Sequence, residues 1–137
     1  SESGLSSLKN ILLYYLNGKL VFATGNGLYR FDKKADTFYS DSTLGELFTG
    51  ESKDIYALYE DKTGDVYISQ VVIYQGSIGV ASKNADDSYT WNSTQYNKLP
   101  WMNINMMYID ENKNLGEFIK IFKTLLMLNK FTSLVRI

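Results

Sequence analysis

The chain has 137 residues, of which 45% are apolar, and its formal net charge is -1. This length is enough for one domain with a core, and the small charge creates no field that would attract nucleic acid or an anionic membrane surface. The sequence contains no Cys and no His, which excludes disulfides, cysteine nucleophiles, Ser-His-Asp catalysis and most zinc sites. We therefore predict no nucleic-acid partner, no metal and no cofactor.

The chain begins with small and polar residues, Ser1 to Ser7, which lack the basic and apolar regions of a signal peptide. No apolar run reaches the length of a transmembrane helix. We expect neither a signal peptide nor a membrane span in this chain.

Short runs of strand-forming residues follow, separated by turn residues such as Asn17–Gly18 and Asn26–Gly27. The first group of predicted strands covers residues 10–16, 19–24, 27–32 and 36–39. The second group covers residues 54–60, 65–73, 78–83 and 88–96, with a longer connection around Gln75, Gly76 and Ser77. Four short strands in about forty residues are typical of one antiparallel propeller blade.

The two groups are related by an internal repeat. Ile55–Asp61 (IYALYED) recurs as Ile104–Asp110 (INMMYID), 49 residues later, and Gly18 matches Gly64 at a distance of 46 residues. Periods of this length are typical of β-propellers. The fold class predicted is all-β, a partial β-propeller of about two and a half four-stranded antiparallel blades. Blade one is assigned to residues 8–40, blade two to 54–97 and the start of a third to 103–114, all within a region spanning 1–114.

The last segment, residues 115–137, has a different composition. It carries four basic side chains and one acidic side chain, and its apolar residues fall near helical spacing. Three interpretations stay open: an amphipathic C-terminal helix that covers a sheet edge, an irregular terminus, and a helix on a membrane surface.

Two stretches resemble a known repeat. Gly25–Asp32 (GNGLYRFD) and Tyr59–Ile68 (YEDKTGDVYI) are similar to the two-component regulator propeller repeat, and the resemblance covers about residues 8 to 115. Phe38–Phe48, Ile78–Ser82 and Asp87–Trp91 resemble one subgroup of these sensors. Phe22 and Tyr67 stand where the family prefers Trp.

The resemblance implies the periplasmic, ligand-sensing region of a hybrid histidine kinase that carries a triple-tyrosine domain. Signal transduction without catalysis is the function it implies. The full ring would contain more blades than this chain supplies.

Candidate ligand-binding residues are the aromatic side chains of the second repeat and its exit, because flat rings stack on sugars or aromatic ligands. They are Trp91, Trp101, Tyr74 and Tyr96. Packing between blades is the alternative role for the same rings. The adjacent carboxylates Glu60–Asp61, Asp86–Asp87 and Asp110–Glu111 lie beside predicted turns, so we assign them to turn hydrogen bonds.

The function predicted is a non-catalytic, ligand-sensing segment whose partner is a small molecule or oligosaccharide. The alternative is a structural or protein-interaction module that forms a homo-oligomer through exposed blade edges. An enzyme is not predicted, because no convergent pair of carboxylates can be identified in the sequence.

Overall fold

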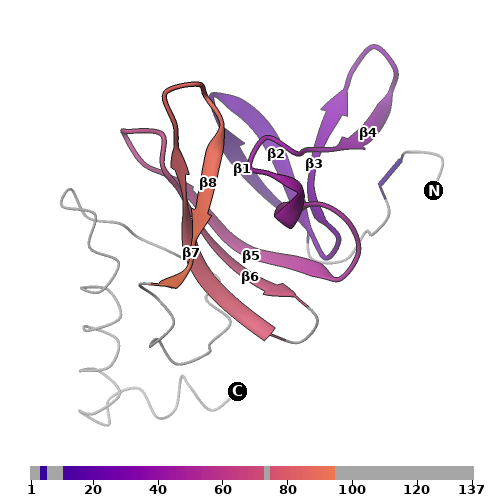
Figure 1. The fold of residues 1–137 in the computed structure, drawn as a ribbon. Helices are drawn as coiled ribbons and strands as arrows, with labels where there is room; N and C mark the ends of the chain where they lie inside the picture. The colour runs from indigo at the N-terminus through magenta and orange to yellow at the C-terminus, as the bar shows by residue number, and fades with distance from the viewer. Residues whose placement is uncertain (1–3, 6–10, 73–74, 95–137) are drawn as a thin grey trace, which may run out of the picture. The chain divides into compact units, whose positions relative to one another are not determined.

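The computed structural model describes residues 4–5, 11–72 and 75–94. All of them belong to the first of the two units into which the chain divides, Ser1–Met106. This part of the chain is all-β, as predicted, and its only helix is the single 3-10 turn η1 (Glu46–Phe48). Its strands form two four-stranded antiparallel sheets (Figure 1). The C-terminal segment, for which a helix is one of the interpretations, and the predicted start of a third blade lie outside the described residues.

Each sheet is a meander in which strands that follow one another in the chain pair as neighbours. The first sheet consists of β1 (Leu12–Leu16), β2 (Lys19–Thr24), β3 (Gly27–Asp32) and β4 (Thr37–Ser40). The second consists of β5 (Lys53–Glu60), β6 (Val66–Val72), β7 (Gln75–Lys83) and β8 (Tyr89–Asn92). A connection over residues 41–52, which contains η1, joins β4 to β5.

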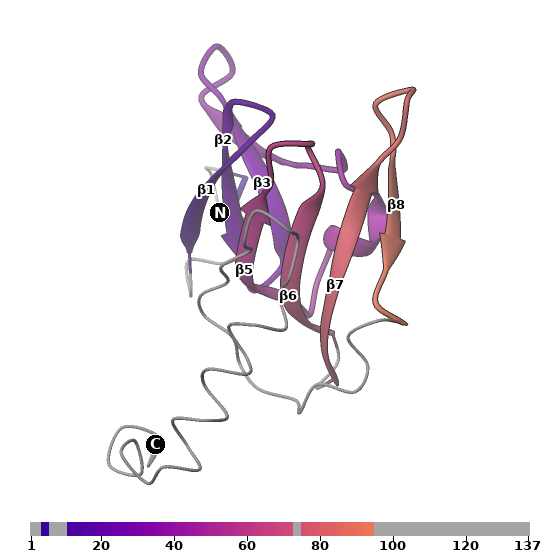
Figure 2. The same ribbon diagram turned by 90° about the vertical axis from the view of Figure 1, so that its left-hand side faces the viewer.

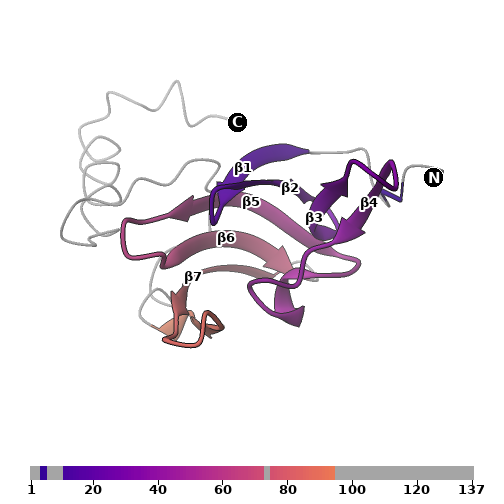
Figure 3. The ribbon, with the colours of Figure 1, turned by 90° about the horizontal axis from the view of Figure 1, so that it is seen from above.

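The core lies between the two sheets. Alternate residues of β2 face it, with Val21 and Ala23 fully buried, and Leu16 and Leu28 extend this face across β1 and β3. The second sheet contributes the residues Leu58, Val66, Ile68 and Ala81. Among the strands of the second sheet, β5 contacts β1, β2 and β3 of the first (Figure 3).

The two sheets contact each other through non-equivalent faces. The repeat aligns Gly18 with Gly64, so Val66 and Ile68 of β6 correspond to Leu20 and Phe22 of β2. In the second sheet these positions face the core, whereas in the first sheet they face away from it. Equivalent faces therefore do not meet, which makes the contact heterologous, the kind that can be repeated by further copies of the same unit.

Strand β6 is buried on both of its faces. Val66 and Ile68 lie against the first sheet, and Tyr67 and Ser69, which point the opposite way, are also buried. A strand buried on both faces belongs to a sheet that is covered on both sides.

Two sequence predictions about the second sheet were wrong. Gln75 and Ser77 form the start of β7 rather than a connection, because they pair with Val72 and Gln70 across the hairpin. Strand β8 ends at Asn92, not at residue 96, since the Asn92 Oδ1 accepts a hydrogen bond from the Thr94 N–H at 2.9 Å and turns the chain.

The loops 61–65 and 84–88 share one geometry, although their sequences differ. In the first, the Asp61 N–H donates to the Asp65 carbonyl at 2.9 Å, and the Gly64 N–H donates to the Asp61 carbonyl at 3.0 Å. The second repeats both bonds, and the fourth residue of each loop, Gly64 or Asp87, has positive φ, 87° and 64° respectively. This is a type I turn followed by a G1 bulge.

We predict that Gly64→Ala lowers the free energy of unfolding by about 1 kcal/mol, because a Cβ disfavours positive φ. The added Cβ would lie 2.9 Å from Cδ of the flexible Lys83 side chain, so the backbone conformation is the main cost. Gly64→Asn is the control, and its free energy of unfolding should fall less, since Asn tolerates positive φ. Urea denaturation of both variants measures the difference, and equal stabilities would contradict the assignment.

Candidate ligand-binding site

The structure describes one of the four aromatic residues predicted to bind a ligand. Trp91 lies on β8, whereas Tyr74, Tyr96 and Trp101 lie outside the described residues. The prediction for those three stays a prediction.

Trp91 is half-buried and serves partly as a core residue. Its ring meets the fully buried ring of Phe48 edge to face, with centroids 5.0 Å apart and an interplanar angle of 78°. Figure 2 shows η1, which carries Phe48, beside β8. The ring therefore packs against the connection between the two sheets, and this contact orients the indole.

Strand β7 carries the residue that lets the indole lie close to the sheet, Gly79. A Cβ at Gly79 would lie 2.6 Å from Cζ2 and Cη2 of Trp91, closer than van der Waals contact allows. The position of Trp91 therefore depends on the missing side chain.

An open cleft of about 480 Å³ borders this ring. Its walls come from η1 and from β6, β7 and β8. They include Leu47, Gln70, Val72, Gln75, Ser77 and Trp91. We call this the Trp91 cleft.

Gln70 is the unusual residue of the Trp91 cleft. Its side chain is 2% exposed, yet no hydrogen-bond donor from the described residues reaches its Oε1 atom. Leaving a buried amide oxygen without a donor costs about 1–3 kcal/mol. Because Oε1 is itself buried, it can receive a ligand hydroxyl or N–H when the amide turns toward the cleft that Gln70 lines.

The chemistry of the Trp91 cleft is neutral. Among its described lining residues no side chain is charged, and its polar groups are the amides of Gln70 and Gln75 and the hydroxyl of Ser77. A flat aromatic face with neutral hydrogen-bonding groups suits an uncharged ligand that carries hydroxyl groups.

Of the paired carboxylates assigned to turns, Asp61 and Asp86 act in their turns, whereas Oε2 of Glu60 accepts the Asn17 N–H at 2.8 Å and Asp87 pairs with Lys83 at 2.9 Å. Asp110 and Glu111 lie outside the described residues. Oδ1 of Asp61 accepts the Thr63 N–H at 2.8 Å and the Asp65 N–H at 3.1 Å. Hydrogen bonds from the Ser88 hydroxyl and N–H lower the pKa of Asp86 below its ordinary value. Within the described ranges, no group of three or more acidic residues could hold a metal ion.

Sequence reasoning found Trp91 but missed Gln70. A glutamine in a strand is ordinarily read as a solvent-facing residue. The only signal in the sequence is the alignment of Gln70 with Thr24, which is also buried. The Thr24 hydroxyl, however, donates a hydrogen bond to the nearby Gly27 carbonyl at 3.0 Å.

The comparisons with known proteins find no match to this chain among family models, curated proteins or solved structures. In the part of the chain that is described, no helix has the length and apolar character needed to cross a membrane.

We predict that Gly79→Ala displaces the Trp91 indole and the backbone at Asn92, because the added methyl group overlaps both the ring and, at 2.7 Å, the Asn92 carbonyl oxygen. The free energy of unfolding should fall by about 1–3 kcal/mol, a typical cost of overpacking. Trp91 fluorescence, recorded in a Trp101→Phe background, should change its emission maximum. Ser82→Ala, on the same strand, is the control, and an unchanged spectrum for Gly79→Ala would contradict the close packing.

Proposed function

We propose that this segment is a non-catalytic, ligand-binding part of a propeller-type sensor and that it binds a neutral oligosaccharide in the Trp91 cleft. The observation that carries the ligand class is the pairing of an oriented indole with the buried Oε1 of Gln70, which has no hydrogen-bond partner among the described residues. Sugars offer an apolar ring face for stacking and hydroxyl groups for such an acceptor.

The propeller part of the proposal is supported by the packing of the two sheets. A heterologous contact between successive four-stranded meanders is the relation that neighbouring blades have in a ring. Burial of β6 on both faces fits a blade between two neighbours. A periplasmic location and a role in two-component signalling rest on the repeat resemblance alone.

The substitution Gln70→Leu separates binding from stability. We expect it to weaken oligosaccharide binding at least about tenfold, since it removes the acceptor. Stability should stay unchanged or rise by about 1 kcal/mol, because a buried amide without a full set of partners is replaced by an apolar group of similar size.

Calorimetric titration with ligands selected from a panel of neutral oligosaccharides measures the affinity, and urea denaturation measures the stability. Ser69→Ala is the matched control: Ser69 is the neighbouring buried polar residue and points to the opposite face of β6. Failure of the parent protein to bind any neutral oligosaccharide would contradict the ligand class. A Gln70→Leu variant that binds as the parent does would contradict the site.

A second candidate function, self-association, is favoured by the outer face of the first sheet. Leu13 and Tyr15 point away from the core and are 58% and 69% exposed. Phe31 on the same face is also exposed and packs on Phe38 with ring centroids 5.0 Å apart. Apolar side chains gathered on one face of a sheet are a common feature of protein interfaces.

For this candidate we predict that the double substitution Leu13→Lys and Tyr15→Lys abolishes self-association in sedimentation velocity experiments. The interface would bury two lysine side chains without a charge partner, which is energetically costly. Tyr39→Lys is the control, since Tyr39 is 49% exposed and points to the other face of the sheet. A strictly monomeric parent protein would exclude the interaction role.

A further inference from the structure

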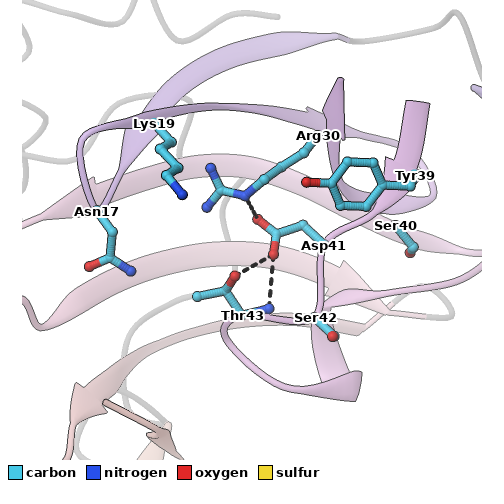
Figure 4. A pocket seen from close by; sticks show the side chains of 8 residues that line it. All are labelled: Asn17, Lys19, Arg30, Tyr39, Ser40, Asp41, Ser42 and Thr43. Atoms are coloured by element: carbon cyan, nitrogen blue, oxygen red, sulfur yellow. Dashed lines mark hydrogen bonds and ion pairs between the residues drawn. The ribbon is translucent and has the colours of Figure 1, made fainter. Parts of the chain in front are cut away.

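A second cleft, of about 560 Å³, lies at the first sheet and differs in chemistry from the Trp91 cleft. Its walls come from the β1–β2 turn, from β2, β3 and β4, and from the start of the β4–β5 connection. The residues that matter here are Asn17, Lys19, Arg30, Tyr39, Asp41 and Thr43 (Figure 4). We call it the Arg30 cleft.

Asp41 holds Arg30 in place. The Asp41 side chain is 4% exposed, and its Oδ2 lies 2.7 Å from Nε of Arg30. Its Oδ1 accepts hydrogen bonds from the N–H and the hydroxyl of Thr43. Both carboxylate oxygens are thus engaged within the protein, so Asp41 orients the guanidinium group and does not itself serve as a ligand acceptor.

Within the described residues, the guanidinium group of Arg30 retains unused donors. Its side chain is only 11% exposed, and it uses Nε for Asp41 and Nη1 for the Leu20 carbonyl at 3.4 Å. A guanidinium group has five N–H donors, so these contacts do not exhaust it. Figure 4 shows the two Nη atoms on the side of the cleft that faces Lys19.

Lys19 is the second cation of this cleft. It is exposed, and its ammonium group points toward the guanidinium group of Arg30 (Figure 4). The charged lining residues are Lys19, Arg30 and Asp41, which sum to a net charge of +1. Two cations that point toward the same space favour an anion between them, and a single excess charge is balanced by a monoanion.

We propose that the Arg30 cleft binds a ligand carboxylate between the Nη side of Arg30 and Nζ of Lys19. A planar carboxylate matches the fork of a guanidinium group, and the ammonium group adds a charge-assisted hydrogen bond. The hydroxyl groups of Tyr39 and Ser42 on the wall can supply further donors. This inference does not depend on the proposed oligosaccharide function, because the two clefts share no described lining residue.

A purely structural role for these residues makes a different prediction. The Arg30–Asp41 pair by itself would tie β3 to the β4–β5 connection, and that role does not involve Lys19. Lys19 is therefore the residue that separates ligand binding from support of the fold.

The test is an NMR titration of the full chain with sodium acetate against sodium chloride at equal ionic strength. We expect acetate to cause saturable shifts of the Arg30 Nε–H signal and of the backbone amides of Asn17 and Thr43. Lys19→Met should weaken acetate binding about tenfold, the usual loss for a charge-assisted hydrogen bond, and Lys19→Arg should retain it.

Lys33→Met is the matched control, since Lys33 is an exposed lysine in the β3–β4 loop, outside the cleft. It should leave acetate affinity unchanged, and unchanged melting temperatures verify that each variant is folded. The absence of saturable shifts, or equal acetate affinity of Lys19→Met and the parent protein, would overturn the proposal. Tighter binding of inorganic phosphate than of acetate would overturn the carboxylate assignment.

Discussion

The contact between the two sheets is the constraint on which the described structure depends. Val21 and Ala23 of the first sheet and Val66 and Ile68 of the second are fully buried in one cluster. Burying the valine and isoleucine side chains contributes about 1.5–3 kcal/mol each, which exceeds what any exposed ion pair here supplies. Because the contact joins unlike faces, Leu13, Tyr15 and Phe31 on the outer face of the first sheet are left exposed.

The connection between the sheets, residues 41–52, completes the core and builds both clefts. Phe48 is fully buried and positions Trp91, while the neighbouring Leu47 lines the Trp91 cleft. Asp41, at the start of the same connection, anchors Arg30 in the other cleft. One segment thus contributes to the walls of both clefts, of which the described lining is uncharged in the Trp91 cleft and carries a net positive charge in the Arg30 cleft.

The Trp91 cleft contains a polar group that stability alone would not select. Among the described residues no donor reaches the buried Oε1 of Gln70, and this carries an energetic cost that a donor from a ligand would relieve. Departures from local rules of this kind are concentrated at functional sites. By contrast, Oδ1 of Asp61 and Oδ1 of Asp86 accept hydrogen bonds within their own turns.

The sequence by itself determined the strands, because the alternation of apolar and polar residues and the turn residues that end each run are local. It also identified Trp91 as a candidate. The extra residues of β7 escaped prediction because Gln75 and Ser77 are polar and become strand only by pairing with β6. The ion pair of Arg30 with Asp41 needs the third strand to lie beside the connection that follows the fourth. Only the tertiary structure decided which face of each sheet is covered, and hence that Gln70 is buried, because burial depends on a second sheet and on η1.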